Sequence, residues 1–295
     1  MKKCLLWGTG LIFGQYYNTL QYYKWQNKIE IIGITSSEPY YTHIMGIPFI
    51  QTKDIDLSTF DRLIVMADSD SLRAISQKAS ILCISDSNIV PVKAMSIPGF
   101  DFDKYKAIRE NVPSIIAPNC WAGLLYNKLG LEFKTPFINM FIGHEDYLKL
   151  LKDFNRYMNA SLELVKYGYN RELNINYPIV KCADILLYFN HYHSFKEVEA
   201  CWNRRKKRLN SKNMIVMFYD ENIPDIDDFL HLEYEKKICF VPFSFKDESV
   251  FSMADINYTP DTPFWKIVNR GAAGYYYDLF ELLLSNRFVR FTDFV

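Results

Sequence analysis

Cys4-Leu5-Leu6-Trp7-Gly8-Thr9-Gly10 is the stretch that decides the fold of the first part of the chain. The residues before Gly8 form an apolar run of strand length, and after Gly10 the apolar residues recur at helical spacing. A second apolar run at residues 29–34 completes the pattern within about 30 residues. Strand, glycine turn, helix and strand predict a βαβ unit, whose crossover makes the two strands parallel.

The same alternation continues to about residue 112. Apolar runs at residues 47–50, 63–67 and 81–84, with a helix over 71–79, extend the first sheet. We therefore expect a small Rossmann-like, doubly wound N-terminal domain over residues 1–112, its boundary at the end of the proline-containing segment 91–113.

A second domain is expected over residues 113–295. Its predicted strands cover residues 114–117, 185–189, 214–218 and 238–241. Its predicted helices cover residues 121–129, 147–158, 195–209 and 276–283. Strands that alternate with helices indicate an α/β domain with a mostly parallel sheet.

Composition excludes several classes of protein. The 295 residues exceed one ordinary hydrophobic core, and Lys plus Arg equals Asp plus Glu at 34 each, which argues against a nucleic-acid partner. The six cysteines include no Cys-x-x-Cys pair, so we expect reduced thiols and no zinc knuckle. No apolar run approaches the roughly 20 residues that span a bilayer. Glycines interrupt the apolar start, which disfavours a signal peptide, and we expect a cytoplasmic protein that does not span the membrane.

The first glycine turn is a candidate phosphate site. Gly8 permits the tight turn, and Gly10 lets a phosphate approach the backbone where the next helix offers unpaired N–H groups. Phe13 replaces the third glycine of the dinucleotide fingerprint, and no acidic residue ends the second strand, which weakens the case for NAD. The alternative is that the glycines only close a turn. The predicted ligand-binding residues are Gly8, Thr9, Gly10, Gly14, Thr35, Ser36, Ser37 and Asp68.

The first third of the chain resembles the small nucleotide-sugar-binding domains attached to bacterial sugar-modifying enzymes. The segments that carry this likeness are residues 4–10, 31–34, 45–50 and 63–67. Residues 114–290 resemble an uncharacterised bacterial family associated with exopolysaccharide (capsule) biosynthesis. That likeness rests on residues 119–123, 135–142, 177–179, 191–192 and 202–208. The resemblance implies a setting in sugar chemistry and supplies no catalytic residues.

Polar residues follow predicted strands of the second domain. His191 follows the strand at 185–189, Asp220 follows the strand at 214–218, and Asn119 precedes the helix at 121–129. Ligands of α/β proteins bind at the carboxyl ends of strands, so these three are the candidate catalytic residues, with Asp220 expected to join His191 across one crevice. Cys120 is a further candidate nucleophile. A purely structural role for each stays open.

Other motifs have structural alternatives. Asp68-Ser69-Asp70 and Asp101-Phe102-Asp103 resemble metal-binding Asp-x-Asp pairs, yet each would equally cap a helix. His191 and His193 would share a face in extended chain, but no third metal ligand is evident. The basic run at 204–208 falls in the last turns of a helix opened by a capping box at Ser194, where cations meet the negative end of the helix dipole.

The leading hypothesis is a cytoplasmic polysaccharide-biosynthesis protein that binds a nucleotide sugar or another activated sugar and transfers a glycosyl or modifying group. One alternative is a non-enzymatic module that senses a nucleotide or binds a pathway partner, and another is an NAD(P)-dependent sugar oxidoreductase. The sequence specifies no cofactor, metal or oligomeric state.

Overall fold

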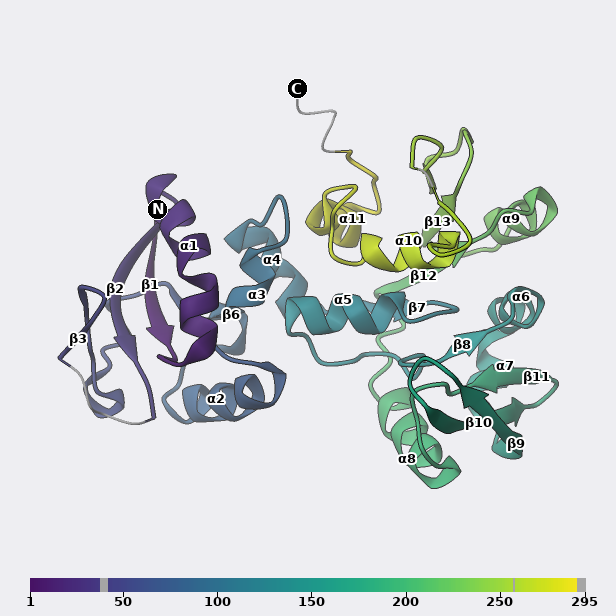
Figure 1. Ribbon diagram of the computed structural model, residues 1–295, viewed down its shortest axis with the longest axis horizontal. Coiled ribbons are helices and arrows are strands. Elements are labelled where there is room, and N and C mark those ends of the chain that lie inside the picture. The colour runs from purple at the N-terminus through teal and green to yellow at the C-terminus, as the bar shows by residue number, and fades with distance from the viewer. Residues whose placement is uncertain (38–41, 257, 291–295) are drawn as a thin grey trace. The chain divides into compact units, whose positions relative to one another are not determined.

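The computed structural model describes residues 1–37, 42–256 and 258–290, except the side chains of Ser69 and Asp70 (Figure 1). The chain forms two compact units. Unit 1 comprises Met1–Glu110 and Asn127–Leu131, and unit 2 comprises Asn111–Tyr126 and Glu132–Val295. Each unit combines helices with parallel strands, which confirms the α/β class expected from the sequence.

Unit 1 is built on a four-stranded parallel sheet with the strand order β2-β1-β5-β6. The strands are β1 (Lys2–Trp7), β2 (Ile29–Thr35), β5 (Arg62–Val65) and β6 (Ile89–Pro91), and a short antiparallel pair is formed by β3 (His43–Ile44) and β4 (Ile47–Pro48). The helices are α1 (Leu11–Trp25), α2 (Ser69–Ile81), α3 (Val92–Met95) and α4 (Phe102–Glu110), with single 3-10 turns at Thr52–Asp54 and Asp86–Asn88.

The βαβ unit predicted at the start is confirmed, because β1 and β2 pair in parallel and α1 connects them. The predicted strand at 81–84 is wrong: Ile81 ends α2, Cys83 adopts a positive φ of 62°, and the strand begins at Ile89. The run at 47–50 contributes mainly to the β3–β4 pair, with a single parallel bridge from Ile34 to Phe49.

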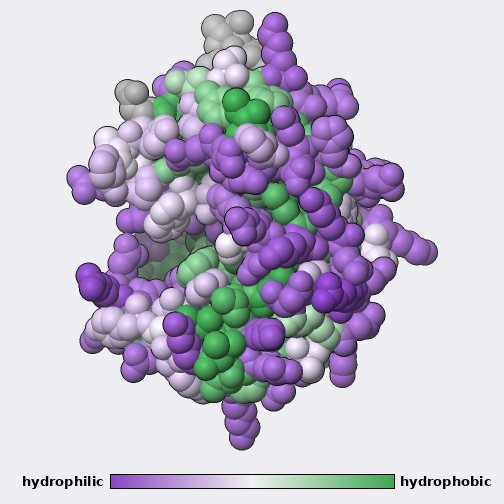
Figure 2. All heavy atoms as spheres, turned by 90° about the vertical axis from the view of Figure 1, so that its right-hand side faces the viewer, coloured by the Kyte–Doolittle hydropathy of each residue, from purple (hydrophilic) through white to green (hydrophobic). Residues whose placement is uncertain are grey.

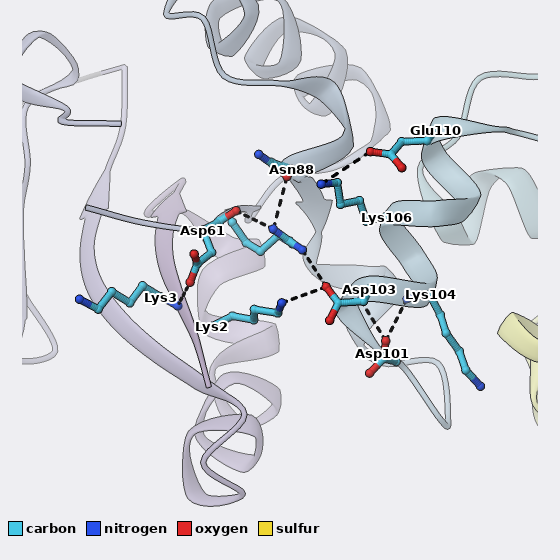
Figure 3. A network of polar contacts seen from close by, with 10 residues as sticks. Lys2, Lys3, Asp61, Asn88, Asp101, Asp103, Lys104, Lys106 and Glu110 are labelled. Atoms are coloured by element: carbon cyan, nitrogen blue, oxygen red, sulfur yellow. Dashed lines mark hydrogen bonds and ion pairs between the residues drawn. The ribbon is translucent and has the colours of Figure 1, made fainter. Parts of the chain in front are cut away.

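Charged side chains tie the amino-terminal ends of β1 and β5 to α4 (Figure 3). The largely buried Arg62 bonds the Asp103 carboxylate at 3.0 Å and the Asn88 amide oxygen at 3.3 Å, and Lys2 reaches the same carboxylate at 2.9 Å. Asp101 accepts the backbone N–H of Asp103 and caps α4. The Asp101–Asp103 pair therefore has the structural role rather than the metal-binding one.

Unit 2 contains a second parallel sheet with the order β14-β13-β12-β7. Its strands are β7 (Ser114–Ile116), β12 (Met214–Tyr219), β13 (Lys236–Val241) and β14 (Val250–Ser252). The helices that begin in this unit are α5 (Trp121–Leu129), α6 (His144–Lys152), α7 (Phe154–Asn159), α8 (Phe195–Lys206), α9 (Ile223–Leu230), α10 (Phe264–Gly271) and α11 (Leu279–Ser285).

Between β7 and β12 the chain inserts a separate antiparallel sheet with the order β8-β11-β10-β9. Its strands are β8 (Phe141–Ile142), β9 (Leu162–Asn170), β10 (Ile175–Cys182) and β11 (Ile185–Tyr188). The strand expected at 185–189 therefore exists but does not belong to the parallel sheet. Most of β9 is exposed, Leu164 and Val165 included. Figure 2 views the molecule from the right-hand side of Figure 1 and shows apolar side chains gathered in its lower part. In Figure 1 the antiparallel sheet lies at the same height.

Apolar side chains cover both faces of the parallel sheet of unit 2. One face contributes Ile116, Val216 and Phe218 to a core that also includes residues of α6, α9 and the antiparallel sheet. On the other face Phe240 packs against Trp121 and Tyr277. Burial on both sides leaves the strand ends as the part of this sheet that polar side chains can occupy. Among the described residues, no helix combines the length and the hydropathy that a bilayer-spanning segment needs.

Candidate functional site

The carboxyl edge of the parallel sheet of unit 2 carries the candidate site. The neighbouring strands β7 and β12 run in parallel, so the residues that follow them emerge at the same edge. Asn119 and Cys120 lie between β7 and α5, and Asp220 directly follows β12. Loops at this edge are where open α/β sheets bind their ligands.

Asp220 holds His144 in a short hydrogen bond. Asp220 Oδ2 lies 2.6 Å from His144 Nδ1, while Oδ1 accepts the backbone N–H groups of Glu221 at 2.7 Å and Asn222 at 3.0 Å. Burial by itself raises the pKa of Asp220, but the hydrogen bonds from His144 and from the two N–H groups outweigh it, and the pKa lies below its ordinary value. The carboxylate therefore stays ionised and accepts the Nδ1 proton of the imidazole.

The position of His144 is fixed by the start of α6. The Tyr147 hydroxyl, one turn further on, lies 2.8 Å from the carbonyl oxygens of both Ile116 in β7 and Met217 in β12. The His144 ring packs edge-on against Tyr219 at 5.0 Å between centroids, and its side chain remains 31% exposed. Among the described residues its Nε2 has no hydrogen-bond partner. This nitrogen is therefore free to exchange a proton with a bound molecule.

Cys120 and His191 form a second pair at the same edge. Cys120 Sγ lies 3.5 Å from His191 Nε2, within the range for a hydrogen bond to sulfur. Burial raises the pKa of the Cys120 thiol to about 11, and burial also lowers the pKa of His191. Both shifts favour the neutral thiol and the neutral imidazole at physiological pH. The raised pKa of the thiol and the lowered pKa of the imidazole both oppose proton transfer in the resting pair, so the thiol would pass its proton to His191 only as the sulfur bonds to a bound molecule.

Asn119 and Tyr219 directly precede Cys120 and Asp220 in the chain. Asn119 is 6% exposed, its Oδ1 accepts the N–H of Trp121 at 3.0 Å, and its buried Nδ2 has no hydrogen-bond partner among the described residues. Burial raises the pKa of Tyr219 to about 12, with Asn119 opposing that effect and with Asp220 and Cys120 adding to it. The Tyr219 hydroxyl keeps its proton at neutral pH and remains a donor.

The three catalytic candidates predicted from the sequence all lie in unit 2. The expected pairing of Asp220 with His191 is not the one observed. Asp220 bonds His144 rather than His191, and His191 contacts Cys120. The sequence did not single out His144, because the helix was expected to begin near Tyr147. The feature of the sequence that could have identified His144 is its position directly after Gly143, at the start of an amphipathic helix. His191 reaches the site after an antiparallel strand, which corrects the expected parallel geometry.

His191 and His193 lie in a turn rather than in extended chain, and the His193 N–H donates to Glu197 Oε2 at 3.1 Å. Within the described residues no group of three or more His, Cys, Asp or Glu side chains is arranged to hold a metal ion. Ser194 caps α8 by accepting the N–H of Glu197, as the capping box predicted. The basic residues Arg204 and Arg205 lie in the last turn of α8.

The glycine turn of unit 1 lies where the sequence predicted it, but its two glycines differ in what they can do. Gly8 has a φ of 119°, and a Cβ there would lie 2.7 Å from the Met66 carbonyl oxygen, so only glycine fits. Its N–H donates to the Thr35 carbonyl at 2.8 Å and is not available to a ligand. Gly10 has open space around its Cβ position and is the N-cap residue of α1, where no side chain caps the helix. A phosphate would therefore be held beyond Gly10 rather than at Gly8.

The other predicted ligand residues of unit 1 are distributed around this turn. Asp68 Oδ1 accepts the Ser71 N–H at 2.9 Å and caps α2, and Ser37 Oγ accepts from Lys78 at 2.8 Å. Thr35 is fully buried, and its Oγ1 has no partner among the described residues. The remaining predicted residues here are Thr9 and Ser36, which are half-buried, and Gly14, which is exposed. The side chain of Asp70 lies outside the described residues.

Comparisons with known proteins assign the chain to a family but indicate no activity for it. Residues 1–90 match the family described as C2185-like, N-terminal, and residues 92–283 match the Domain of unknown function (DUF1919). An uncharacterized protein of Haemophilus influenzae is 28% identical over 130 residues, which cover 43% of this chain and only 60% of that protein. The crystal structure of Vibrio cholerae aspartate semialdehyde dehydrogenase II complexed with ASA covers 93% of this chain and 95% of its own at 10% identity, but its TM-score of 0.27 is too low to support an argument. By the match over residues 92–283, this chain belongs to the DUF1919 family.

Proposed function

We propose that unit 2 is a transferase in which His144, oriented by Asp220, removes the proton from a hydroxyl group of the acceptor. The observation that carries the proposal is the 2.6 Å contact between His144 Nδ1 and Asp220 Oδ2, made at the carboxyl edge of the parallel sheet. It leaves Nε2 without a partner among the described residues, on a side chain that is partly exposed.

The chemistry follows from the hydrogen bonds. With Nδ1 donating to Asp220, the neutral imidazole presents an unprotonated Nε2, which is the form that accepts a proton. Proton uptake makes an imidazolium, and the adjacent ionised carboxylate stabilises that charge. A general base placed in this way contributes about 100-fold to 10,000-fold to the rate.

The acceptor we propose is a sugar hydroxyl. Support for this class comes from the resemblance of residues 114–290 to proteins associated with exopolysaccharide biosynthesis. All six cysteines are free, which fits the reducing cytoplasm that we propose as the location.

The test is a donor and acceptor panel with product detection by mass spectrometry. Purified protein is incubated with nucleotide sugars or acyl thioesters and with a mixture of monosaccharides and oligosaccharides. We expect His144→Gln to lower product formation by about 100-fold or more with the fold unchanged. His231→Gln is the matched control, since His231 is an exposed histidine of the same unit whose Nδ1 bonds only a backbone carbonyl of its own helix. Product formation by His144→Gln within about twofold of the parent would contradict the base role.

Failure of every donor in the panel would instead favour the non-enzymatic alternative, a module that binds a nucleotide or a pathway partner. The control for that outcome is a thermal-shift screen of the same nucleotides, because a ligand that binds only the folded state raises its stability whether or not it reacts.

We propose as a second function that unit 1 binds the phosphate of a nucleotide or nucleotide sugar beyond Gly10. The supporting observations are the glycine start of α1, the open space at Gly10, and the strand order that places β1 and β5 side by side where the connections leave in opposite directions. Binding there is tested by the thermal-shift screen with diphosphate sugars and with NADP. A shift with NADP alone would replace this ligand class by a redox dinucleotide.

A further inference from the structure

The candidate site contains three of the groups that carbonyl chemistry uses, namely a thiol, an imidazole beside it and a buried amide donor in the residue before the thiol. Cys120 immediately precedes the first residue of α5, and its Sγ is 3.5 Å from His191 Nε2. The preceding residue, Asn119, is 6% exposed, and its Nδ2 makes no hydrogen bond of ordinary geometry among the described residues. None of these groups takes part in the hydrogen bond between His144 and Asp220.

We infer that Cys120 is the nucleophile of an acyl transfer and that His191 receives its proton. Asn119 Nδ2 is the donor that stabilises the oxyanion formed when the thiol adds to the carbonyl carbon. The inference rests on the proposed function for its second half, in which His144 activates the acceptor hydroxyl.

The class of donor follows from the unused amide. A buried donor without a partner destabilises the folded site, and a bound oxygen that gains negative charge would satisfy it. Addition of a thiol to an acyl thioester or ester creates such an oxygen. Attack at the anomeric carbon of a sugar creates none at the reacting centre. The site therefore favours an acyl donor over a glycosyl donor.

The neutral resting state of the pair is consistent with this role. Burial holds the Cys120 thiol protonated and keeps His191 in its neutral form, so the thiolate is generated only as His191 takes the proton. A thiol in this state resists oxidation and metal capture between turnovers.

The steps balance without an added oxidant or reductant. In the first half, the Cys120 sulfur bonds the acyl carbon, its proton passes to His191, and the collapsing intermediate expels the donor's thiolate, which leaves as a thiol with the proton from His191. In the second half, His144 takes the proton of the acceptor hydroxyl, the acceptor oxygen bonds the acyl carbon, and the carbon–sulfur bond breaks. The proton held by His144 returns to the Cys120 sulfur, which restores the resting thiol and two neutral imidazoles.

The test is covalent trapping of the acyl group on the full chain. The protein is incubated without acceptor in acetyl coenzyme A or, as a generic donor, p-nitrophenyl acetate, and the intact mass and the peptide map are recorded. We expect one acetyl group on Cys120, its loss in Cys120→Ala, and acylation slowed by about 100-fold in His191→Gln. Cys201→Ala is the matched control, because Cys201 is a half-buried thiol of α8 whose Sγ accepts a hydrogen bond from Arg204 at 3.3 Å rather than facing an imidazole.

A second set of variants makes the test independent of folding. Cys120→Ser keeps the size of the side chain and is expected to retain a slow acyl ester that resists transfer. Asn119→Ala is expected to slow acylation by about 100-fold while its thermal unfolding midpoint shows that it folds. Acetylation that persists in Cys120→Ala, or that maps to another cysteine at the same rate, would overturn the inference. No acetylation of folded parent protein by either donor would overturn it as well.

The His144→Gln variant separates this inference from the proposed function. Accumulation of acetyl-Cys120 together with loss of transfer to a sugar supports both. Acetyl-Cys120 that transfers at the parent rate in His144→Gln refutes the base role and leaves the nucleophile standing. Transfer that depends on His144 but never labels Cys120 refutes the nucleophile and leaves the base standing.

Discussion

Replacement of Asp220 by asparagine tests the site most directly, because it changes charge and proton placement and almost nothing else. The introduced amide would have the same size as the carboxylate, and its oxygen would still accept the N–H groups of Glu221 and Asn222. Its NH₂ group would face His144 Nδ1 as a donor. The imidazole would then carry its proton on Nε2, the nitrogen that the proposed reaction needs unprotonated.

The magnitudes differ for stability and for catalysis. Asp220→Asn exchanges hydrogen bonds to a charged acceptor for ordinary ones, which we expect to cost about 1–2 kcal/mol of unfolding free energy. The wrong tautomer is expected to lower turnover by about 10,000-fold, the effect of the same change in an Asp–His pair of the serine-protease type. A small loss of stability with a large loss of turnover is therefore the signature of the proposed role.

Urea unfolding measures the first quantity, and product formation in the donor and acceptor panel measures the second. Asp247→Asn is the control, since Asp247 lies in the loop between β13 and β14 and its Oδ1 likewise accepts a backbone N–H, from Ser249 at 2.7 Å. Turnover of folded Asp220→Asn within about tenfold of the parent would refute the assignment of His144 as the base.

The remaining predictions concern stability, pH and ligand binding. Gly8→Ala should lower the unfolding free energy by about 2 kcal/mol or more, because its φ is positive and its Cβ would meet the Met66 carbonyl, whereas Gly14→Ala, with open space in α1, should raise it by about 0.5–1 kcal/mol in urea titrations. Gly10→Val should fold normally and lose any thermal shift caused by diphosphate sugars; an unchanged shift would move the phosphate site elsewhere. The pKa of Asp220 is lower in the folded than in the unfolded chain. Its contribution to the free energy of unfolding is therefore complete above about pH 4 and is lost as the pH falls through the pKa of the folded state. Asp220→Asn should thus show a shallower acid decline of the thermal midpoint, and an equal decline in both proteins would contradict this.

Local pattern predicted the elements whose burial follows a simple period. The opening βαβ unit, the strand β7 and the helix α5 have strong apolar runs bounded by turn residues, and each was found close to its expected bounds. The β9–β10 hairpin was missed because most of β9 is exposed and carries little alternation. The helix expected over 147–158 is divided at Asp153, which caps α7 by accepting the N–H of Arg156. A cap of this kind ends one helix and starts the next while the apolar residues keep their helical spacing. The periodicity of the sequence therefore does not reveal the break.

The sequence by itself determined the α/β class, the glycine turn after β1, and the placement of Asn119 and Asp220 at strand ends, because each depends on neighbours within a few residues. Tertiary structure alone decided the partners. His144 meets Asp220 across 76 positions, and Cys120 meets His191 across 71. These contacts exist because an antiparallel sheet is inserted between β7 and β12 and because Tyr147 anchors α6 on both strands. Periodicity describes which face of an element is buried, whereas the pairing of side chains from distant elements depends on how those faces pack.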